Sequence, residues 1–402
     1  MLIVQILFWG CFLGVLHTYI FYPALMKWLY SRKQEGDGEF QEEDLFQPEV
    51  TVLMSVYNEA AVILQKLESI DAVHYPKSKL RIYIGSDSSK DGSDELISDF
   101  IKGKPEYHFF PFDNRSGKIV VIQRLIDQLK HENPIAPDHI FLFTDANVLL
   151  DTSAVQNLVR HFIQPQIAIV DTNMINLGSS AKGISRAEER YITGEVLLKH
   201  HEGAVWGCMM GAFGGCFAVR STFFQRVPPN FIVDDFFITM SAMVDGGWVI
   251  NDLNAKCYEA IPNDIGEEYK RKRRISAGNF QNLLYFRKVL WSRPWQRAFA
   301  FLSHKVLRWI TPILLLTGLL CLVYLSLAHR WEYRLMLWIW VVVLFLVPLL
   351  DWLLFKMNIH IGIMRKVRYF VYMNIALLHG LIVYVNGIKT NVWQPPKRKS
   401  ID

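Results

Sequence analysis

The sequence contains few cysteines and little excess charge, and both shortages narrow the classes of protein that it can encode. Only five of the 402 residues are cysteine, and no two of them have a Cys-x-x-Cys spacing. This usage is typical of a reducing compartment and supports neither a zinc site nor a disulfide framework. The net charge is only +5, from 43 basic and 38 acidic residues, so bulk electrostatics give no case for nucleic acid as a partner.

Apolar residues, in contrast, are abundant: they make up 51% of the chain, and the mean hydropathy is positive at +0.16. Residues 2–26 contain no charged side chain apart from a histidine, and Lys27, Arg32 and Lys33 follow them. A run of this length exceeds a signal-peptide core, and no small-residue cleavage site is evident, so we predict a retained transmembrane helix over residues 1–30. The basic flank predicts an outside N-terminus and a cytoplasmic main domain.

The C-terminal part contains further apolar runs that predict about three membrane spans within residues 310–390. The runs cover residues 310–328, 335–355 and 369–388. Four full spans would leave the basic C-terminal tail outside, against the positive-inside rule, so one apolar segment is expected to be re-entrant or interfacial.

Residues 279–309 alternate aromatic and basic side chains and are interrupted by Pro294, a pattern typical of amphipathic helices in the membrane interface. Asp351 is the one charged residue in its apolar run. We expect it at the interface beside Lys356, with the alternative that it lines an acceptor channel.

Residues 48–278 have the pattern of a folded α/β domain. Four apolar runs each end in a polar turn, and a helical pattern follows the first three; the runs are residues 49–57, 80–85, 107–111 and 140–143. Repeated strand, turn and helix predict a parallel sheet with helices on both faces. Acidic residues fall at the carboxyl ends of these strands, where open α/β sheets bind their ligands.

The fourth run ends in Thr144-Asp145-Ala146-Asn147. In an extended chain, Asp145 and Asn147 point to the same side. Their oxygen atoms suit a hard cation such as Mg²⁺ or Mn²⁺. The alternative is an Asx-turn in which Asn147 caps the next segment.

Two adjacent acids, Asp234 and Asp235, precede a helical pattern over residues 236–244. Adjacent carboxylates raise one another's pKa, which suits a general base. The alternative is a helix cap, and a base at the start of a helix can fill both roles.

Together these segments resemble the family 2 glycosyltransferases, in particular membrane-integrated members such as the cellulose, hyaluronan and poly-N-acetylglucosamine synthases. The resemblance implies a GT-A fold, a Rossmann-like α/β domain for nucleotide-diphospho-sugars, with transmembrane helices at both ends. It implies a nucleotide-sugar donor, expected to be UDP-linked. Tyr57 and Glu59, at the end of the opening strand, would line the base pocket. Asp87, in a diacidic motif whose first acid is Ser86 here, and Lys118, in Asn-Arg-Ser-Gly-Lys, would hold the nucleotide.

The resemblance also assigns roles to later motifs. Asp145-Ala-Asn147 corresponds to the Asp-x-Asp metal site, with Asn in the second position. Gly214 and Gly215 lie in a segment similar to the glycine-bearing loop beside the acceptor, where glycine allows close approach of the backbone to a sugar. Asp235 corresponds to the general base, preceded by Asp234.

The Gln-x-x-Arg-Trp motif of processive synthases is altered here to Arg271-Lys-Arg-Arg274-Ile275. Arg274 is retained and is implied to assist departure of the diphosphate, as Arg271 and the neighbouring cations also would. The alternative for this basic run is a solvated or headgroup-facing surface. Ile275 lacks the ring that stacks on the acceptor sugar, which argues against processive synthesis.

The expected function is therefore that of a membrane-bound inverting glycosyltransferase in polysaccharide or glycoconjugate biosynthesis. It would use Mg²⁺ or Mn²⁺, a nucleotide-sugar donor and a lipid-linked or cell-surface glycan acceptor. We expect it to be a multi-pass protein of the inner (plasma) membrane, in contact with membrane lipids and with its catalytic domain in the cytoplasm. Two alternatives are transfer to polyprenyl phosphate and a non-catalytic scaffold or translocation subunit.

Overall fold

The structure is a computed structural model, and it describes residues 1–33, 46–132, 134–177, 185–259, 265–328, 331–357 and 359–388. The chain divides into two compact units. Of the described residues, those between 29 and 177 and between 195 and 259 form the sheet unit, and those between 1 and 28, between 185 and 194 and between 265 and 388 form the helical unit.

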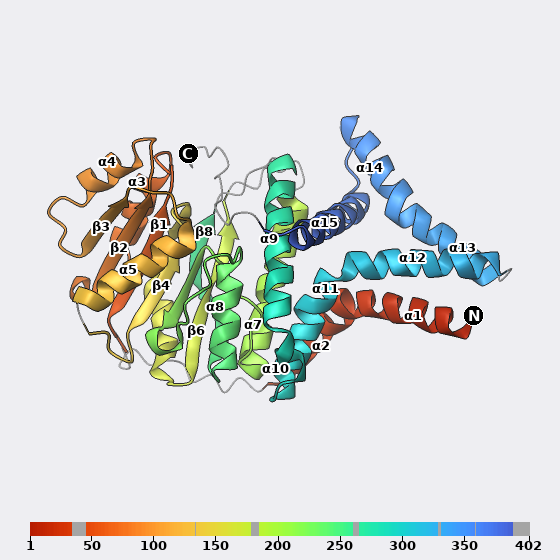
Figure 1. Cartoon of the computed structure of the whole chain (residues 1–402), viewed down its shortest axis with the longest axis horizontal. Helices are drawn as coiled ribbons and strands as arrows, with labels where there is room; N and C mark the ends of the chain where they lie inside the picture. Colours follow the sequence, from red (N-terminus) through yellow and green to blue (C-terminus); the bar gives the residue numbers. More distant parts are fainter. Residues whose placement is uncertain are drawn as a thin grey trace. The chain divides into compact units, whose positions relative to one another are not determined.

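The sheet unit is built on an eight-stranded sheet in the order β3-β2-β1-β4-β7-β6-β8-β5 (Figure 1). Its strands are β1 (Val50–Val56), β2 (Leu80–Asp87), β3 (Tyr107–Phe112), β4 (Ile140–Thr144), β5 (Val148–Leu150), β6 (Ile167–Asn176), β7 (Cys216–Arg220) and β8 (Trp248–Glu259). The first four strands are parallel, as predicted. The sheet as a whole is mixed, because β7 runs antiparallel to β4 and β6, and β5 runs antiparallel to β8.

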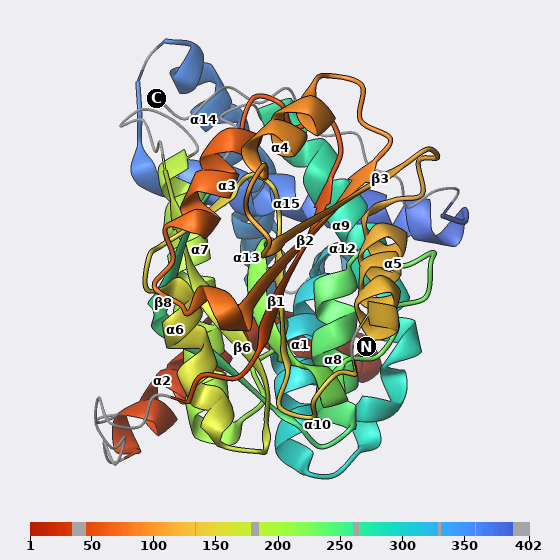
Figure 2. The same cartoon turned by 90° about the vertical axis from the view of Figure 1, so that its left-hand side faces the viewer.

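Helices cover both faces of this sheet (Figure 2). On one face lie α3 (Ile63–Asp71), α4 (Ser93–Phe100) and α6 (Ala154–Val159), and on the other lie α5 (Lys118–Glu132) and α8 (Asp234–Val244). In α5, Val121, Leu125 and Leu129 are fully buried. Their spacing of four residues places them on one side of the helix, which packs on β1 and β2. This double cover explains why β1 and β4 are almost continuously apolar.

The helical unit contains the segments that are long and apolar enough to cross a membrane, except for residues 29–32 at the end of the first one. Among the residues that the structure describes, three continuous stretches meet this description: Leu2–Arg32, Trp331–Lys356 and Gly362–Val385. In addition, the two helical stretches Trp295–Trp309 and Thr311–Leu327 are bent by 65° relative to each other, and together they form either a broken span or a re-entrant loop. The positive-inside rule had predicted one such segment. The helices are α1 (Leu2–Leu16), α2 (Tyr22–Arg32), α9 (Ile265–Tyr285), α10 (Trp295–Ala300), α11 (Leu307–Trp309), α12 (Thr311–Leu327), α13 (Trp331–Val341), α14 (Val347–Lys356) and α15 (Gly362–Val385).

The helical unit also includes α9, and the predicted end of the catalytic domain at residue 278 stays a prediction. α9 packs along α15, where the Ser276 hydroxyl donates to the Leu377 carbonyl at 2.9 Å. A Cβ on Gly380 would lie 2.3 Å from the Ser276 Cβ and 2.8 Å from the Arg273 carbonyl oxygen, so the close approach of the two helices requires glycine. The division therefore falls before α9, because α9 packs extensively on α15.

Asp351 on α14 is only 1% exposed, and its Oδ2 lies 2.9 Å from Nε of Arg368 on α15. Asp351 thus pairs with Arg368 of the next helix and not with Lys356, and its position at the membrane interface stays a prediction. The Lys356 ammonium instead lies over the Trp352 ring, 3.9 Å from its centroid. Asp351 pairs with the neighbouring helix because a charge buried among apolar side chains needs a counter-charge.

Candidate active site

Asp145 and Lys118 form an ion pair at the carboxyl edge of the parallel strands. Asp145 directly follows β4, and its side chain is 37% exposed. Lys118 begins α5, and its Nζ donates to Asp145 Oδ1 at 2.6 Å and lies 3.9 Å from Asp234 Oδ2. Desolvation alone would lower the pKa of Lys118, but the charges of Asp145 and Asp234 outweigh it and raise this pKa above its ordinary value. Lys118 therefore stays protonated and joins the two acids.

Asp234 and Asp235 lie in the first turn of α8. Asp235 Oδ1 accepts a hydrogen bond from the backbone N–H of Phe236 at 2.8 Å, so the carboxylate also satisfies a donor at the start of the helix. Burial, and after it the charge of Asp234, raises the pKa of Asp235 to about 6. The sequence predicted the effect of the adjacent acid, whereas burial makes the larger contribution. A pKa close to neutrality suits a general base.

The glycine segment joins these residues through its backbone. A Cβ on Gly214 would lie 2.7 Å from Asp235 Oδ2, so a side chain at this position would collide with the carboxylate. The Gly214 carbonyl accepts from Lys118 Nζ at 3.3 Å. The Gly215 carbonyl accepts from the Asp145 N–H at 2.9 Å. The structure thus brings together Asp145, Lys118, Asp235 and both glycines, which the sequence singled out separately.

Asn147 lies in the turn between β4 and β5, two residues after Asp145. Its Nδ2 donates to Glu259 Oε1 at 2.9 Å, so the side chain reaches across to β8 instead of capping the next segment. Since the nitrogen is the donor in this bond, the side-chain oxygen is the atom that a cation would use. Among the described residues, no group of three or more His, Cys, Asp and Glu side chains could hold a metal ion.

Asp87, at the end of β2, is 3% exposed and receives hydrogen bonds from a neighbouring backbone segment. Its Oδ1 accepts from the Ser116 N–H at 2.6 Å, and its Oδ2 accepts from the Gly117 N–H at 2.8 Å. Asp87 therefore fixes the residues that lead directly into Lys118. Its contact with a nucleotide stays a prediction.

Tyr57 and Glu59 follow β1 at the same edge of the sheet. The guanidinium of Arg115 lies 3.6 Å from the centroid of the Tyr57 ring, within the range of a cation–π contact. Glu59 is 8% exposed, and its backbone N–H donates to the Ser93 hydroxyl at 2.9 Å. Their roles as the walls of a base pocket stay predictions.

Arg271 and Arg274 lie on α9 and belong to the helical unit. Arg271 Nη1 is 3.5 Å from Oε2 of Glu268, three residues earlier on the same helix. The predicted roles of both arginines beside the diphosphate stay predictions.

The sequence analysis did not identify Lys66, which is fully buried on α3. Its Nζ donates to Thr144 Oγ1 at 2.7 Å and also to the carbonyl of Val148, so it holds the residues on both sides of the Asp145–Asn147 turn. Burial lowers the pKa of Lys66 to about 8. A signal was present, because Lys66 shares the apolar side of α3 with Ile63, Leu67 and Ile70.

Two family models match the chain. Glycosyl transferase family 2 matches residues 51–225. Glycosyl transferase family group 2 matches residues 140–384, which is more than half of the chain. The chain belongs to the family 2 glycosyltransferases.

A curated relative of this glycosyltransferase is the poly-beta-1,6-N-acetyl-D-glucosamine synthase of Staphylococcus epidermidis. The two are 22% identical over 246 residues, which cover 58% of this chain and 55% of the synthase. The chain therefore spans about half the length of the curated relatives that it matches. A probable glycosyltransferase of Bacillus subtilis, YdaM, is 36% identical over 53 residues, or 13% of each chain.

Among solved structures, a mannosyltransferase from Pyrobaculum calidifontis in complex with GDP-Man and Mn²⁺ is similar to this chain. The TM-score is 0.65 at 17% sequence identity, and the match covers 94% of this chain and 99% of the mannosyltransferase. At this identity the likeness shows the fold. The mixed α/β sheet is thus GT-A-like, as the sequence predicted.

Proposed function

We propose that this glycosyltransferase is an inverting enzyme that transfers a sugar from a nucleotide-sugar donor, expected to be a UDP-sugar, to a lipid-linked or glycan acceptor. The observation that carries the proposal is the convergence of Asp145, Lys118 and Asp235 on the backbone of Gly214 and Gly215. This arrangement brings together a carboxylate at a strand end, a cation and a second carboxylate of raised pKa. The first carboxylate and the cation suit donor binding, and the second carboxylate suits proton abstraction.

Asp235 is the proposed general base. Inverting transfer requires that the acceptor hydroxyl lose its proton as its oxygen attacks the anomeric carbon. With a pKa of about 6, the Asp235 carboxylate is ionised at neutral pH and is still a better proton acceptor than an ordinary aspartate. Asp234 raises this pKa by its charge, and Gly214 leaves Oδ2 free of a side-chain clash.

A divalent cation, Mg²⁺ or Mn²⁺, is part of the proposal, and the donor atoms at the turn fit one. Asp145 is partly exposed, and Asn147 adds a side-chain oxygen. Mg²⁺ commonly binds through one or two carboxylates and completes its shell with substrate phosphates and water. When bound, the cation supplies Lewis-acid stabilisation of the diphosphate leaving group. The Mn²⁺ in the mannosyltransferase complex supports the same use here.

Other residues of the chain would bind and orient the donor. Tyr57, Glu59 and Asp87 would contact the nucleoside. Lys118, protonated beside Asp145, would lie close to the diphosphate and offset part of its charge. Arg271 and Arg274 of α9 would assist departure of the diphosphate.

The acceptor is proposed to be membrane-associated because the same chain carries the apolar helices. We place the enzyme in the inner (plasma) membrane, with the sheet unit in the cytoplasm, because basic residues follow the first apolar helix. A polyprenyl phosphate is the second candidate acceptor. Its oxygen is already anionic and needs no base, so the two acceptors make different demands on Asp235.

The experiment incubates the purified full-length protein, in detergent or liposomes, with a panel of radiolabelled nucleotide sugars and with Mg²⁺ or Mn²⁺. Chromatography then separates lipid-linked product from polymer. The proposal expects transfer from one donor, and that transfer should stop in the Asp145→Ala variant. If no donor in the panel yields a glycosylated product with either metal, the proposal is wrong.

A further inference from the structure

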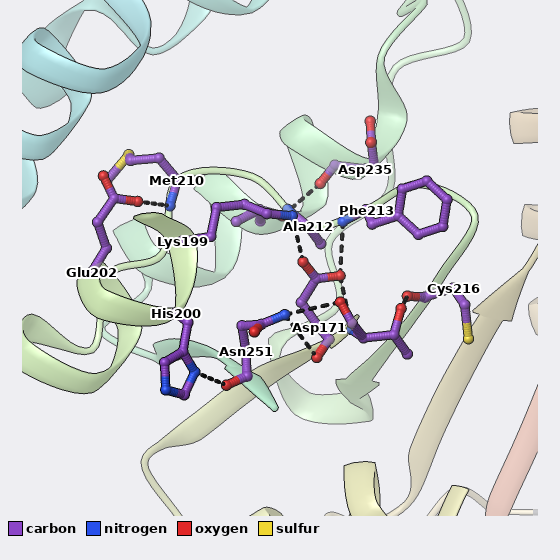
Figure 3. Close-up of polar contacts among 12 residues, drawn as sticks. Asp171, Lys199, His200, Glu202, Met210, Ala212, Phe213, Cys216, Asp235 and Asn251 are labelled. Carbon is purple, nitrogen blue, oxygen red and sulfur yellow. Dashed lines mark hydrogen bonds and ion pairs between the residues drawn. The ribbon is translucent and has the colours of Figure 1, made fainter. Parts of the chain in front are cut away.

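The loop of residues 210–215, which precedes β7, is held from inside by buried side chains of three different elements (Figure 3). The elements are α7 (Ser185–Trp206), α8 and β6. Three backbone N–H groups of the loop donate to them: Met210 to Glu202 Oε2 at 3.0 Å, Ala212 to Thr239 Oγ1 at 3.1 Å, and Phe213 to Asp171 Oδ1 at 2.8 Å.

Asp171 is bound at the same time to a lysine. Its Oδ2 accepts from Lys199 Nζ at 2.6 Å, and its Oδ1 also accepts from the Thr172 N–H at 3.0 Å. The side chain of Asp171 is 0% exposed and that of Lys199 is 7% exposed. The ion pair is therefore almost fully desolvated, and one of its carboxylate oxygens holds the loop backbone.

The other side of the loop forms part of the proposed active site. The carbonyls of Gly214 and Gly215 accept from Lys118 and from the Asp145 N–H, and Gly214 packs against Asp235. Thr239, which holds Ala212, also donates to the backbone carbonyl of Asp235 at 2.7 Å. A displacement of the loop would thus move the backbone that lies against both the proposed base and the proposed metal ligand.

A buried ion pair is a costly way to fill a core, because apolar side chains of similar volume often give equal or greater stability. The ion pair does, however, fix the orientation of the Asp171 carboxylate. Because Lys199 binds one oxygen, the other oxygen accepts from the Phe213 N–H at a fixed position. Neither member is needed for donor binding or proton abstraction in the proposed mechanism.

We propose that Lys199 and Asp171 are positioning residues that set the backbone of Phe213 and Gly214 against the Asp235 carboxylate, and so align the acceptor hydroxyl with its base. The inference rests on the proposed function for the role of Asp235. The arrangement of the loop itself does not depend on that role.

The charges around these groups give a second reason to expect an effect on catalysis. Asp235 faces Asp234 on its own helix, Lys118 on α5 and Lys199 on α7. Lys199 faces Asp171, Glu195 and Asp235. Burial and Asp234 raise the pKa of Asp235, while Lys118 and Lys199 act in the opposite direction. Removal of the Lys199 charge should therefore raise the pKa of Asp235 further.

The test compares Lys199→Met, Lys199→Arg and Asp171→Asn with wild type in the full-length protein. The matched control is Lys104→Met, which breaks a partly exposed ion pair with Asp71 elsewhere in the sheet unit. Four measurements are made: thermal unfolding, UDP affinity with Mn²⁺, the pH dependence of kcat, and hydrogen exchange of peptides that cover the 210–215 loop.

For Lys199→Met we expect UDP affinity within about threefold of wild type, a kcat at least about tenfold lower, faster exchange in the loop, and an acidic limb of the pH profile that moves to higher pH. Asp171→Asn should lower kcat and speed exchange in the loop. Lys199→Arg keeps the charge and should recover most of the activity. Lys104→Met should match wild type in kcat and in loop exchange.

The inference is overturned if Lys199→Met leaves kcat and loop exchange unchanged, or if UDP affinity falls in step with kcat, because that indicates a general folding defect. If Lys199→Met does not fold, the neutral double variant Asp171→Asn with Lys199→Met takes its place and is judged by the same outcomes. A wild-type protein without transfer from any donor overturns the proposed function instead. In that case loop exchange in the variants still supports or overturns the placement of the loop by the pair.

Discussion

The Asp235→Asn substitution is expected to abolish sugar transfer and, at the same time, to make the protein more stable at neutral pH. In the proposed mechanism the carboxylate takes the acceptor proton, and an amide cannot do so. Burial and the charge of Asp234 raise the pKa of Asp235 from 3.8 to about 6. Ionisation of this group therefore costs more free energy in the folded protein than in the unfolded chain.

The magnitude follows from the size of this pKa change. A pKa that moves from 3.8 to about 6 corresponds to about 3 kcal/mol, at about 1.4 kcal/mol for each pH unit. Partial solvent contact reduces this figure, so we expect about 1–3 kcal/mol. Because the folded pKa lies above the unfolded one, this contribution favours the folded protein below about pH 4 and is lost as the pH rises through about 6. At neutral pH the asparagine avoids that loss.

The assay is thermal unfolding of the solubilised proteins between about pH 4.5 and about pH 8, beside kcat and UDP affinity at about pH 7.5. Asp235→Asn should bind UDP, transfer no sugar, and melt several degrees above wild type at the higher pH. The difference in melting temperature should narrow as the pH falls below about 6. Asp245→Asn, at the exposed opposite end of α8, is the matched control and should resemble wild type in turnover and melting.

Two results would refute this reasoning in different ways. Near-normal turnover of Asp235→Asn contradicts the assignment of the base and favours polyprenyl phosphate as the acceptor. A melting temperature below that of wild type at about pH 7.5 contradicts the claim that the ionised carboxylate is destabilising in its buried position.

Four further predictions follow from the same structure. Lys118→Met leaves its aspartate partner without a counter-charge, and should raise the KM for the donor at least about tenfold in steady-state assays. Gly214→Ala places a Cβ 2.7 Å from Asp235 Oδ2, and should lower kcat at least about tenfold while UDP binding persists. EDTA should stop transfer, and Mn²⁺ or Mg²⁺ should restore it within one assay. Arg368→Leu leaves the buried Asp351 unpaired and should lower stability by about 3–5 kcal/mol in detergent melts; adding Asp351→Asn should recover most of the loss.

Each of these predictions has a control or a contradicting outcome. Lys102→Met removes an exposed cation that pairs with Asp99 on the surface of the sheet unit, and should leave the donor KM unchanged. Gly194→Ala adds a Cβ with nothing within 4 Å and should leave kcat unchanged. Full turnover in EDTA would exclude the proposed use of the metal. Equal melting of Arg368→Leu and wild type would show that the ion pair is not needed for stability.

The sequence alone determined the local features of the sheet unit. The first four strands were predicted to within about two residues, and a helix was expected after each of the first three, because apolar runs, polar turns and helical spacing are local signals. The same signals marked Asp145 and Asp235 as acids at the end of a strand and the start of a helix. The apolar runs likewise identified the candidate membrane helices.

The tertiary structure decided which distant residues meet. β7 lies antiparallel between β4 and β6, and no local pattern encodes the direction in which a strand is inserted into a sheet. Lys118 pairs with Asp145, Lys199 with Asp171 and Arg368 with Asp351, all over long sequence separations. The partner of a buried charge is set by which elements pack together, and that packing depends on the whole chain. For this reason local sequence patterns and the family resemblance could name the acids of the site, but only the fold could show what holds them in place.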